Sequence, residues 1–374
     1  MPRAAYIHVP FCARRCGYCN FTLVAGRGDL VNDFLHAIEI ELQTLKEPRE
    51  VETLFIGGGT PTFLSPEQLE RFLSTLATWF PLAKGHEFSI EANPADVNVD
   101  RVAVLAAHGV NRISLGAQSF RDQKLRLLER DHSGDDVRRA FYLCRPFRSV
   151  GLDLIFSAPE ETLAEWEADV RTALELQPDH ISTYGLTIEK GTTFFGRWTR
   201  GSLVKPAEEL ERSMYATAIE RITSAGFEHY EVSNFAKSYH RCRHNETYWL
   251  GGEYFAAGPG AARNVGGRRE VNHRSTTTYL QRVLNGQSPV AESEELSPTD
   301  RARELFVFAM RRMEGVRRDW FSERTMFNLD KLLGRPLRKF VEMGLIFDDQ
   351  TTVKLTAEGL FVSDALWPEF LDGD

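Results

Sequence analysis

The chain has 374 residues, of which 42% are hydrophobic and 26% charged, and its mean hydropathy is −0.32. This composition indicates a globular protein of roughly two domains and excludes a wholly disordered, collagen-like or membrane-embedded chain. The formal net charge of −8 disfavours nucleic acid as a partner, and no apolar run is long enough to predict a membrane span.

Apolar, strand-like runs alternate with amphipathic segments from the amino terminus to residue 236. The strand candidates are Tyr6–Phe11, Thr53–Gly57, Phe88–Ala92, Arg112–Gln118, Gly151–Ser157 and Ile181–Leu186. Helices are expected after them, at a segment in which Leu30, Phe34, Ile38 and Leu42 share one face, and at Pro66–Phe80, Asp100–Gly109, Leu163–Leu176 and Glu208–Ala225. This order predicts an α/β domain over residues 1–236, a partial (β/α)6 TIM-type barrel whose functional groups lie at the carboxyl ends of its strands.

Two further regions are predicted after the barrel. Residues 237–297 form a connecting region that begins glycine-rich, aromatic and locally basic, and it could attract an acidic ligand. Residues 298–374 start with a helix at Pro298 and continue with a second helix near Leu332–Val341. Strands at Gly344–Ile346 and Thr352–Leu355 follow. This tail is predicted to be a winged-helix-like α+β module.

Three of the five cysteines, Cys12, Cys16 and Cys19, lie close together just after the first strand. Five cysteines are an odd number, and three of them are clustered, which indicates metal binding in a reducing compartment and not a disulfide framework. The amino terminus also lacks the apolar segment of a signal peptide. We therefore expect a cytoplasmic protein. Three thiolates leave one iron of a 4Fe-4S cluster without a protein ligand, whereas the alternative, a structural zinc loop, needs a fourth ligand such as His8. Cys144 is predicted to be buried filler.

Polar residues and glycines follow several predicted strands. Gly57, Gly58 and Gly59, before Thr60, let a ligand approach the backbone, although a glycine triplet alone is more often just a turn. Three other predicted strands end near a carboxylate or an amide: Glu91, Gln118 and Asp153. Arg130 follows Gln118 in the next loop. A carboxylate can bind an ammonium group or ribose hydroxyls, and an arginine can bind a carboxylate with two hydrogen bonds. Each residue alone is more often structural, but their shared position predicts one site.

With these motifs the chain resembles the oxygen-independent coproporphyrinogen III oxidase family of radical SAM proteins, and within it the HemW-type heme chaperone branch. The matching stretches are Tyr6–Cys12, Gly57–Thr62, Ser89–Pro94, Gly116–Phe120, Arg130–His132, Asp153–Ile155 and Leu355–Leu360. The resemblance implies that Cys12, Cys16 and Cys19 ligate a 4Fe-4S cluster and that S-adenosylmethionine (SAM) binds its open iron. It also implies SAM contacts from Tyr6, Tyr18, Gly58, Gly59, Thr60, Glu91, Gln118, Arg130 and Asp153.

Two features favour the chaperone branch. The oxidases carry a fourth cysteine one residue after the third, and here that position is Phe21. The chaperone branch carries a His-Asn-x-x-Tyr-Trp element, which is present as His244-Asn245-Glu246-Thr247-Tyr248-Trp249. The resemblance therefore implies a chaperone that binds heme and delivers it to an apo-hemoprotein. The chain departs from the family at Phe156–Pro159, where the family has a Gly-Leu-Pro turn. The resemblance therefore does not predict the geometry of the loop beside Asp153.

The heme contacts are expected from His244, Asn245, Tyr248 and Trp249, because an imidazole can ligate iron and aromatic rings can stack on a porphyrin. The alternative is that His244 is a hydrogen-bonded core histidine and Trp249 is packing, and His240 and Cys242 are rival iron ligands. Two other activities stay open: radical decarboxylation of coproporphyrinogen and SAM-dependent methylation and opening of heme. If cluster and SAM gate heme transfer, the loop at Gly258–Gly260 is the expected link.

Overall fold

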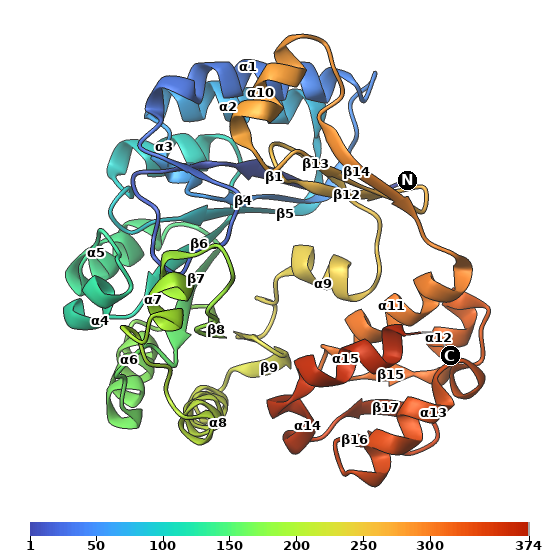
Figure 1. Cartoon of the computed structure of the whole chain (residues 1–374). Coiled ribbons are helices and arrows are strands. Elements are labelled where there is room, and N and C mark those ends of the chain that lie inside the picture. Colours follow the sequence, from blue (N-terminus) through green and yellow to red (C-terminus); the bar gives the residue numbers. More distant parts are fainter. Residues whose placement is uncertain (373–374) are drawn as a thin grey trace.

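The computed structural model describes residues 1–372, and its centre is a sheet with six consecutive parallel strands (Figure 1). These strands are neighbours in chain order: β1 (Ala4–Val9), β4 (Val51–Gly58), β5 (Leu82–Ala92), β6 (Arg112–Gln118), β7 (Ser149–Phe156) and β8 (His180–Gly185). All six predicted strands are confirmed. The partial barrel is confirmed as well, although β5 begins six residues earlier than its apolar part indicates.

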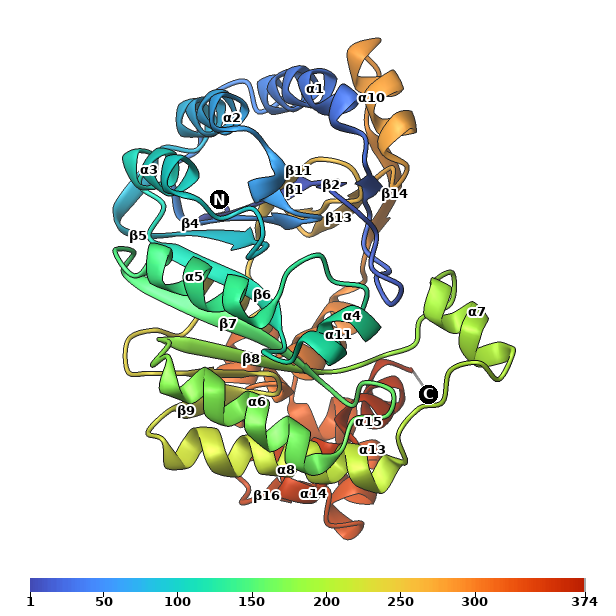
Figure 2. The ribbon, with the colours of Figure 1, turned by 90° about the vertical axis from the view of Figure 1, so that its left-hand side faces the viewer.

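Helices lie between the strands, and most of them cover one face of the sheet, whereas α7 stands apart beside the thiol-bearing loop (Figure 2). They are α1 (Val31–Gln43), α2 (Pro66–Trp79), α3 (Val99–Ala107), α4 (Asp122–Leu127), α5 (Gly134–Cys144), α6 (Leu163–Glu175), α7 (Thr193–Thr199) and α8 (Glu208–Ser224), with 3-10 turns at Gly28–Leu30 and Pro61–Phe63. Several begin at residues that the sequence marks as caps. Ser65 and Thr162 each accept a backbone N–H of the first turn, and the residue three further on returns the bond.

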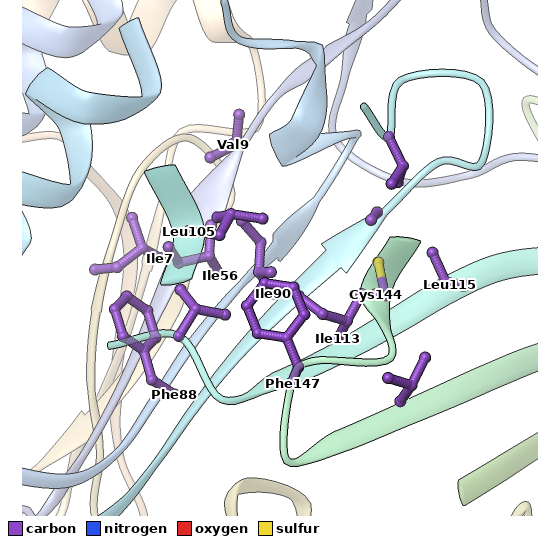
Figure 3. Close-up of a cluster of buried hydrophobic side chains, with 14 of the residues drawn as sticks. Ile7, Val9, Ile56, Phe88, Ile90, Leu105, Ile113, Leu115, Cys144 and Phe147 are labelled. Atoms are coloured by element: carbon purple, nitrogen blue, oxygen red, sulfur yellow. The ribbon is translucent and has the colours of Figure 1, made fainter. Parts of the chain in front are cut away.

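The core lies between this face of the sheet and the helices. Side chains of alternating strand residues, including Ile7, Ile56, Ile90 and Ile113, are fully buried there (Figure 3). Cys144 belongs to the same cluster, so the prediction that it is buried filler is confirmed. The other strand residues face the barrel interior and are largely polar or aromatic.

Short strands that the sequence analysis did not predict extend both edges of the sheet. β11 (Phe255–Ala257) pairs in parallel with β1, and β10 (Asn234–Ala236) and β9 (Glu228–Glu231) continue antiparallel beyond β8. Residues 237–297, predicted as a connecting region, thus contribute a strand to the barrel sheet. They also form α9 (Arg243–Trp249), α10 (Thr276–Leu284) and an antiparallel sheet of β12 (Ala262–Val265), β13 (Arg268–Asn272) and β14 (Val290–Glu295).

A buried carboxylate ties this region to the barrel. Glu41 on α1 accepts hydrogen bonds from Tyr279 Oη at 2.6 Å, from Asn272 Nδ2 at 2.7 Å and from the Gly258 backbone N–H at 2.9 Å. Because a buried carboxylate without donors costs several kcal/mol, these bonds fix α10 and the Gly258 loop against α1. The two helices lie side by side in Figures 1 and 2.

The carboxyl-terminal part has its own core, built around Phe306, Phe321 and Phe370. Its elements are α11 (Pro298–Met310), β15 (Val316–Arg317), α12 (Arg318–Thr325), α13 (Leu329–Glu342), β16 (Ile346–Asp348), β17 (Thr352–Leu355), α14 (Ala357–Phe361) and α15 (Ser363–Leu371). The predicted helices and hairpin are present, and β15 completes a three-stranded sheet. Among residues 1–372, no helix is both long and apolar enough to cross a membrane.

Candidate cofactor pocket and barrel floor

A cavity of about 480 Å³ opens at the carboxyl ends of the parallel strands. Most residues that the sequence analysis assigned to a cluster or to SAM line it together: Cys12, Cys16, Cys19, Tyr18, Gly58, Gly59, Thr60, Glu91, Gln118, Arg130 and Asp153. Tyr6 is the exception. Its ring stacks on Phe55, and its hydroxyl bonds His8 Nδ1 at 3.0 Å.

The loop that carries the three thiols is held at several points. β2 (Phe11–Cys12) pairs with β3 (Val24–Ala25) at its base, and Arg15 donates to the carbonyl oxygens of Cys19 and Leu23. From outside the barrel, Arg274 donates to the Asn20 carbonyl oxygen at 3.2 Å. The loop is therefore shaped by protein contacts before any cofactor binds.

The three thiols fit a cluster better than a zinc ion held with His8. All three are partly exposed to the cavity, and burial raises the pKa of the Cys12 thiol to about 11 while Thr60 Oγ1 lies 3.3 Å from its sulfur. His8 is buried behind the loop, and its two ring nitrogens bond Tyr6 Oη and the Thr22 carbonyl oxygen. His8 is thus committed elsewhere, which leaves three thiol ligands on one loop, the number that gives a 4Fe-4S cluster an open iron.

Two carboxyl groups face the cavity from β5 and β7. Burial, and the nearby Asp153, raise the pKa of Glu91 to about 8, although its Oε2 accepts the Gly58 N–H at 3.0 Å. Burial likewise raises the pKa of Asp153, against hydrogen bonds from Ser182 and Ser114. Carboxyl groups buried at the cavity wall can accept hydrogen bonds from hydroxyls or form an ion pair with an ammonium group.

Arg130 lines the same cavity as the two carboxyl groups. Its Nη2 donates to Asn93 Oδ1 at 3.0 Å and to the Gly116 carbonyl oxygen at 3.2 Å, and its Nη1 lies 3.6 Å from Cys16 Sγ. Its Nε is buried without a hydrogen-bond partner. This guanidinium is fixed in place and is suited to a carboxylate ligand beside the thiols.

The sequence analysis did not assign several lining residues to the site: Asn93, Ser114, Asp131, Ile155, Tyr184 and Leu186. Most of them lie at or just after the carboxyl end of a strand, and this position was the signal that could have found them. Phe21 lies at the cavity too, with 67% of its surface exposed. The position of the missing fourth cysteine therefore belongs to this pocket.

The loop after Asp153 departs from the family's turn without moving Asp153 away from the cavity. Ser157 takes a positive φ of 64°, and the buried Lys124 donates to the Ile155 carbonyl oxygen at 2.6 Å. The ammonium group of Lys124 also pairs with Glu161 and Asp169. This ion network fixes the wall of the pocket from behind.

The four residues predicted to contact heme lie on α9, inside the barrel below this pocket, and none of them lines it. His244 at the start of α9 is buried, with Nδ1 bonded to Thr53 Oγ1 at 3.0 Å and Nε2 to Tyr248 Oη at 2.7 Å. Glu87 accepts the backbone N–H groups of Arg243 and His244 at the helix start. His244 is thus a fully bonded core histidine here, and its ligation of iron, which stays a prediction, requires that one of these bonds break.

The other three members of this element are half-buried. Asn245, Tyr248 and Trp249 all retain partial exposure, and the Arg311 guanidinium lies 4.6 Å from the Trp249 ring centre. Tyr248 meets Tyr254 edge to face at 4.7 Å. The element therefore forms an aromatic floor that closes the barrel, and Figure 1 shows α9 between the sheet and the carboxyl-terminal part.

Comparison with known proteins agrees with this geometry. The profile of the radical SAM superfamily matches residues 6–173, and that of the HemN C-terminal domain matches residues 296–362. The solved structure of coproporphyrinogen III oxidase (HemN) from Escherichia coli superposes with a TM-score of 0.87 at 22% identity, over 99% of this chain and 90% of that one. The fold and the pocket thus define a radical SAM protein with the HemN architecture.

Curated relatives narrow the assignment. The chain is 34% identical to heme chaperone HemW of Bacillus subtilis, over 99% of both chains, and 33% identical to heme chaperone HemW of Escherichia coli, over 99% of this chain and 98% of the relative. It is also 33% identical to the mitochondrial radical S-adenosyl methionine domain-containing protein 1 of Bos taurus, over 97% of this chain and 86% of the relative. The chain belongs to the HemW family.

Proposed function

We propose that this protein is a heme chaperone that binds heme in the cytoplasm and delivers it to an apo-hemoprotein. The observation that carries the proposal is Phe21, which lines the cofactor pocket at the position of the oxidases' fourth cysteine. A benzyl side chain can neither ligate metal nor exchange protons as a thiol does. The same relatives that share the chain's full length are named heme chaperones, which supports this function over porphyrinogen oxidation.

In this proposal Cys12, Cys16 and Cys19 hold a 4Fe-4S cluster at the mouth of the pocket. When bound, a SAM-ligated cluster supplies reducing and radical chemistry. The residues of this chain bind and orient SAM. Gly58, Gly59 and Thr60 offer backbone groups, Arg130 faces the carboxylate, and Glu91 and Asp153 receive the ammonium group or the ribose hydroxyls. The pocket wall adds Tyr18 and Gln118, and we place Tyr6 behind it, where it positions His8.

Heme, the cargo, contacts the aromatic floor in this proposal. Asn245, Tyr248 and Trp249 are half-buried and keep some exposed surface that a porphyrin could contact. His244 would have to give up a bond to Thr53 or to Tyr248 first. The floor therefore supplies stacking surface more readily than an iron ligand.

The test is an anaerobic assay with the reconstituted cluster, SAM and a reductant. Either heme or coproporphyrinogen is added. Heme is then followed by its absorbance, and the reaction products are identified by chromatography. We expect stable heme binding, transfer to an apo-hemoprotein and no protoporphyrinogen. Protoporphyrinogen formation would make the protein an oxidase without the fourth cysteine, and SAM-dependent loss of heme would indicate heme methylation and opening. The Phe21→Cys variant is the matched control for a gain of oxidase activity.

A further inference from the structure

His132 lies behind the cofactor pocket, in the loop between Arg130 and α5. Its side chain is buried and does not line the cavity. Its Nε2 lies 3.0 Å from the carbonyl oxygen of Ala117 in β6, and its Nδ1 lies 3.1 Å from Asn93 Oδ1 just after β5. The ring therefore joins the ends of two neighbouring strands behind the SAM contacts.

The orientation of the Asn93 amide is fixed by its other partners. Arg130 Nη2 lies 3.0 Å from Asn93 Oδ1, and a guanidinium group can only donate hydrogen bonds. On the other side, Asn93 Nδ2 donates to Asp131 Oδ1 at 3.0 Å, and Asp96 Oδ2 lies 3.4 Å away. Turning the amide over would set its NH2 group against Arg130 and its oxygen against the two carboxylates. Asn93 Oδ1 therefore faces both Arg130 and His132.

Both ring nitrogens of His132 consequently face oxygen atoms that only accept hydrogen bonds. A neutral imidazole has one N–H group and one lone pair, so it can bond only one of the two oxygens. The protonated ring donates to both. Because a buried contact between two acceptors is costly, the geometry selects the imidazolium form.

The charges around the loop favour this cation. Asp131 Oδ1 lies 3.8 Å from His132 Nδ1, and hydrogen bonding with His132 and Asn93 holds the pKa of Asp131 well below its usual range. Other carboxylates on the elements packed here are Asp96 after β5, Asp122 on α4, and Asp135 and Asp136 in the first turn of α5. Arg130 is the opposing cation. The carboxylates outnumber it, so a second positive charge is compensated in this network.

We propose that His132 is a positioning residue for SAM binding, an imidazolium that holds the amide of Asn93 and, through it, the guanidinium of Arg130. The proposal rests on the SAM site of the proposed function and deepens it. Loss of the ring proton would set a lone pair against Ala117 or Asn93, and the amide would no longer hold Arg130 Nη2. The affinity for SAM should therefore fall as pH rises through the range in which His132 loses its proton.

The charge of the ring is tested first, without any ligand. The full-length protein is labelled with 15N-histidine and studied by NMR before cluster reconstitution, which keeps iron out of the sample. The two ring nitrogens of an imidazolium resonate close together, whereas those of a neutral ring are well separated. The signals of His132 are those that His132→Gln lacks. We expect the imidazolium pattern at pH 7, and a neutral ring would overturn the proposal.

The role in SAM binding is tested by titrating SAM into the cluster-loaded protein between pH 6 and pH 9. At pH 7 we expect His132→Gln to bind SAM about tenfold more weakly, because a single NH2 group cannot reach both oxygens. This gap should close through the pH range in which the NMR signals show His132 to lose its proton. Glu91, with a pKa of about 8, titrates in both proteins, so the difference between the two profiles isolates His132. A gap that does not follow the NMR titration would indicate a merely structural role and overturn the proposal.

A double variant tests whether His132 acts through Arg130. If it does, His132→Gln combined with Arg130→Ala should bind SAM no more weakly than Arg130→Ala alone. Additive losses would rule out this route.

His86→Gln is the matched control. Both ring nitrogens of His86 also face carbonyl oxygens, those of Ala83 and Gly109, but His86 does not line the cofactor pocket, so SAM affinity should not change. Circular dichroism and iron content check that each variant is folded and loaded. If the wild type and His132→Gln bind SAM equally well, the role of His132 is wrong while the proposed function stands. If the cluster-loaded wild type binds no SAM, the proposed SAM site is wrong and this role falls with it.

Discussion

Nε2 of His8 lies 2.7 Å from the carbonyl oxygen of Thr22, so β1, the strand next to the edge strand β11, holds the thiol-bearing loop from behind. Burial lowers the pKa of His8 to about 4, so the ring is neutral at pH 7. Its other nitrogen is held by Tyr6. The arrangement explains how three thiols can converge on one cavity from a loop that is partly exposed.

Replacing a loop thiol should remove the cluster and leave the fold. In Cys12→Ala we expect iron and sulfide per chain to fall to background after anaerobic reconstitution, because two thiolates do not retain a 4Fe-4S cluster. The free energy of unfolding of the cluster-free protein should change by less than about 1 kcal/mol, since the thiol is partly exposed. Metal analysis and thermal melting measure the two effects.

Cys144→Ala is the matched control for that loss. Cys144 is buried in the hydrophobic core, so the variant should keep its iron and lose about 1 kcal/mol of stability through a small cavity. Iron loss in Cys144→Ala, or retention in Cys12→Ala, would contradict the assignment of ligands.

Arg130 should matter for SAM through its geometry rather than its charge alone. Arg130→Lys keeps the positive charge but loses the planar pair of donors that Asn93 and Gly116 orient, so the dissociation constant for SAM should rise about tenfold. Isothermal titration of the cluster-loaded protein measures it. Arg126→Lys, at an exposed position on α4, is the control, and equal affinities of both variants and the wild type would rule out this role.

Glu91 should make the stability of the ligand-free protein depend on pH. The unfolded chain releases this proton near pH 4.5, whereas the folded protein holds it up to about pH 8, so this group lowers the free energy of unfolding as pH rises between these values. Glu91→Gln should remove on the order of 1 kcal/mol of that decline. Urea unfolding at pH 5 and pH 8 compares the two proteins, and parallel declines would show that Glu91 is ionised in the folded state.

The buried ammonium group of Lys124 should be essential for stability. Lys124→Met leaves Glu161 and Asp169 buried without a cation, and we expect a loss of about 3–5 kcal/mol. Adding Glu161→Gln to that variant should restore part of the loss, because it removes one uncompensated charge. Chemical denaturation measures both, and a loss below about 1 kcal/mol would mean that the network is dispensable.

Much of the barrel could be predicted because its strands are long and apolar and its helices begin at recognisable caps. The shared position of Glu91, Gln118 and Asp153 at strand ends also placed them correctly in one pocket. Parallel strands bring their carboxyl ends together whatever the loops do, so this part of the site follows from the topology alone.

Other parts depend on contacts between distant segments, which no local pattern contains. β11 has three residues, and only its pairing with β1 makes it a strand. The hydrogen bond that occupies His244 Nδ1 comes from Thr53, which lies far away in the sequence.

The pairing of β1 with β11 also has a consequence for how the chain is made. β1 is the first strand to leave the ribosome, but it can pair with β11 only after residues 255–257 have been synthesised. The two strands are therefore far apart in sequence, and their pairing raises the contact order of the fold. Until then β1 presents an open edge to other nascent chains, and chains truncated before β11 should aggregate. Arg274, which fastens the thiol loop, emerges later still, so iron insertion should follow rather than accompany translation of the barrel.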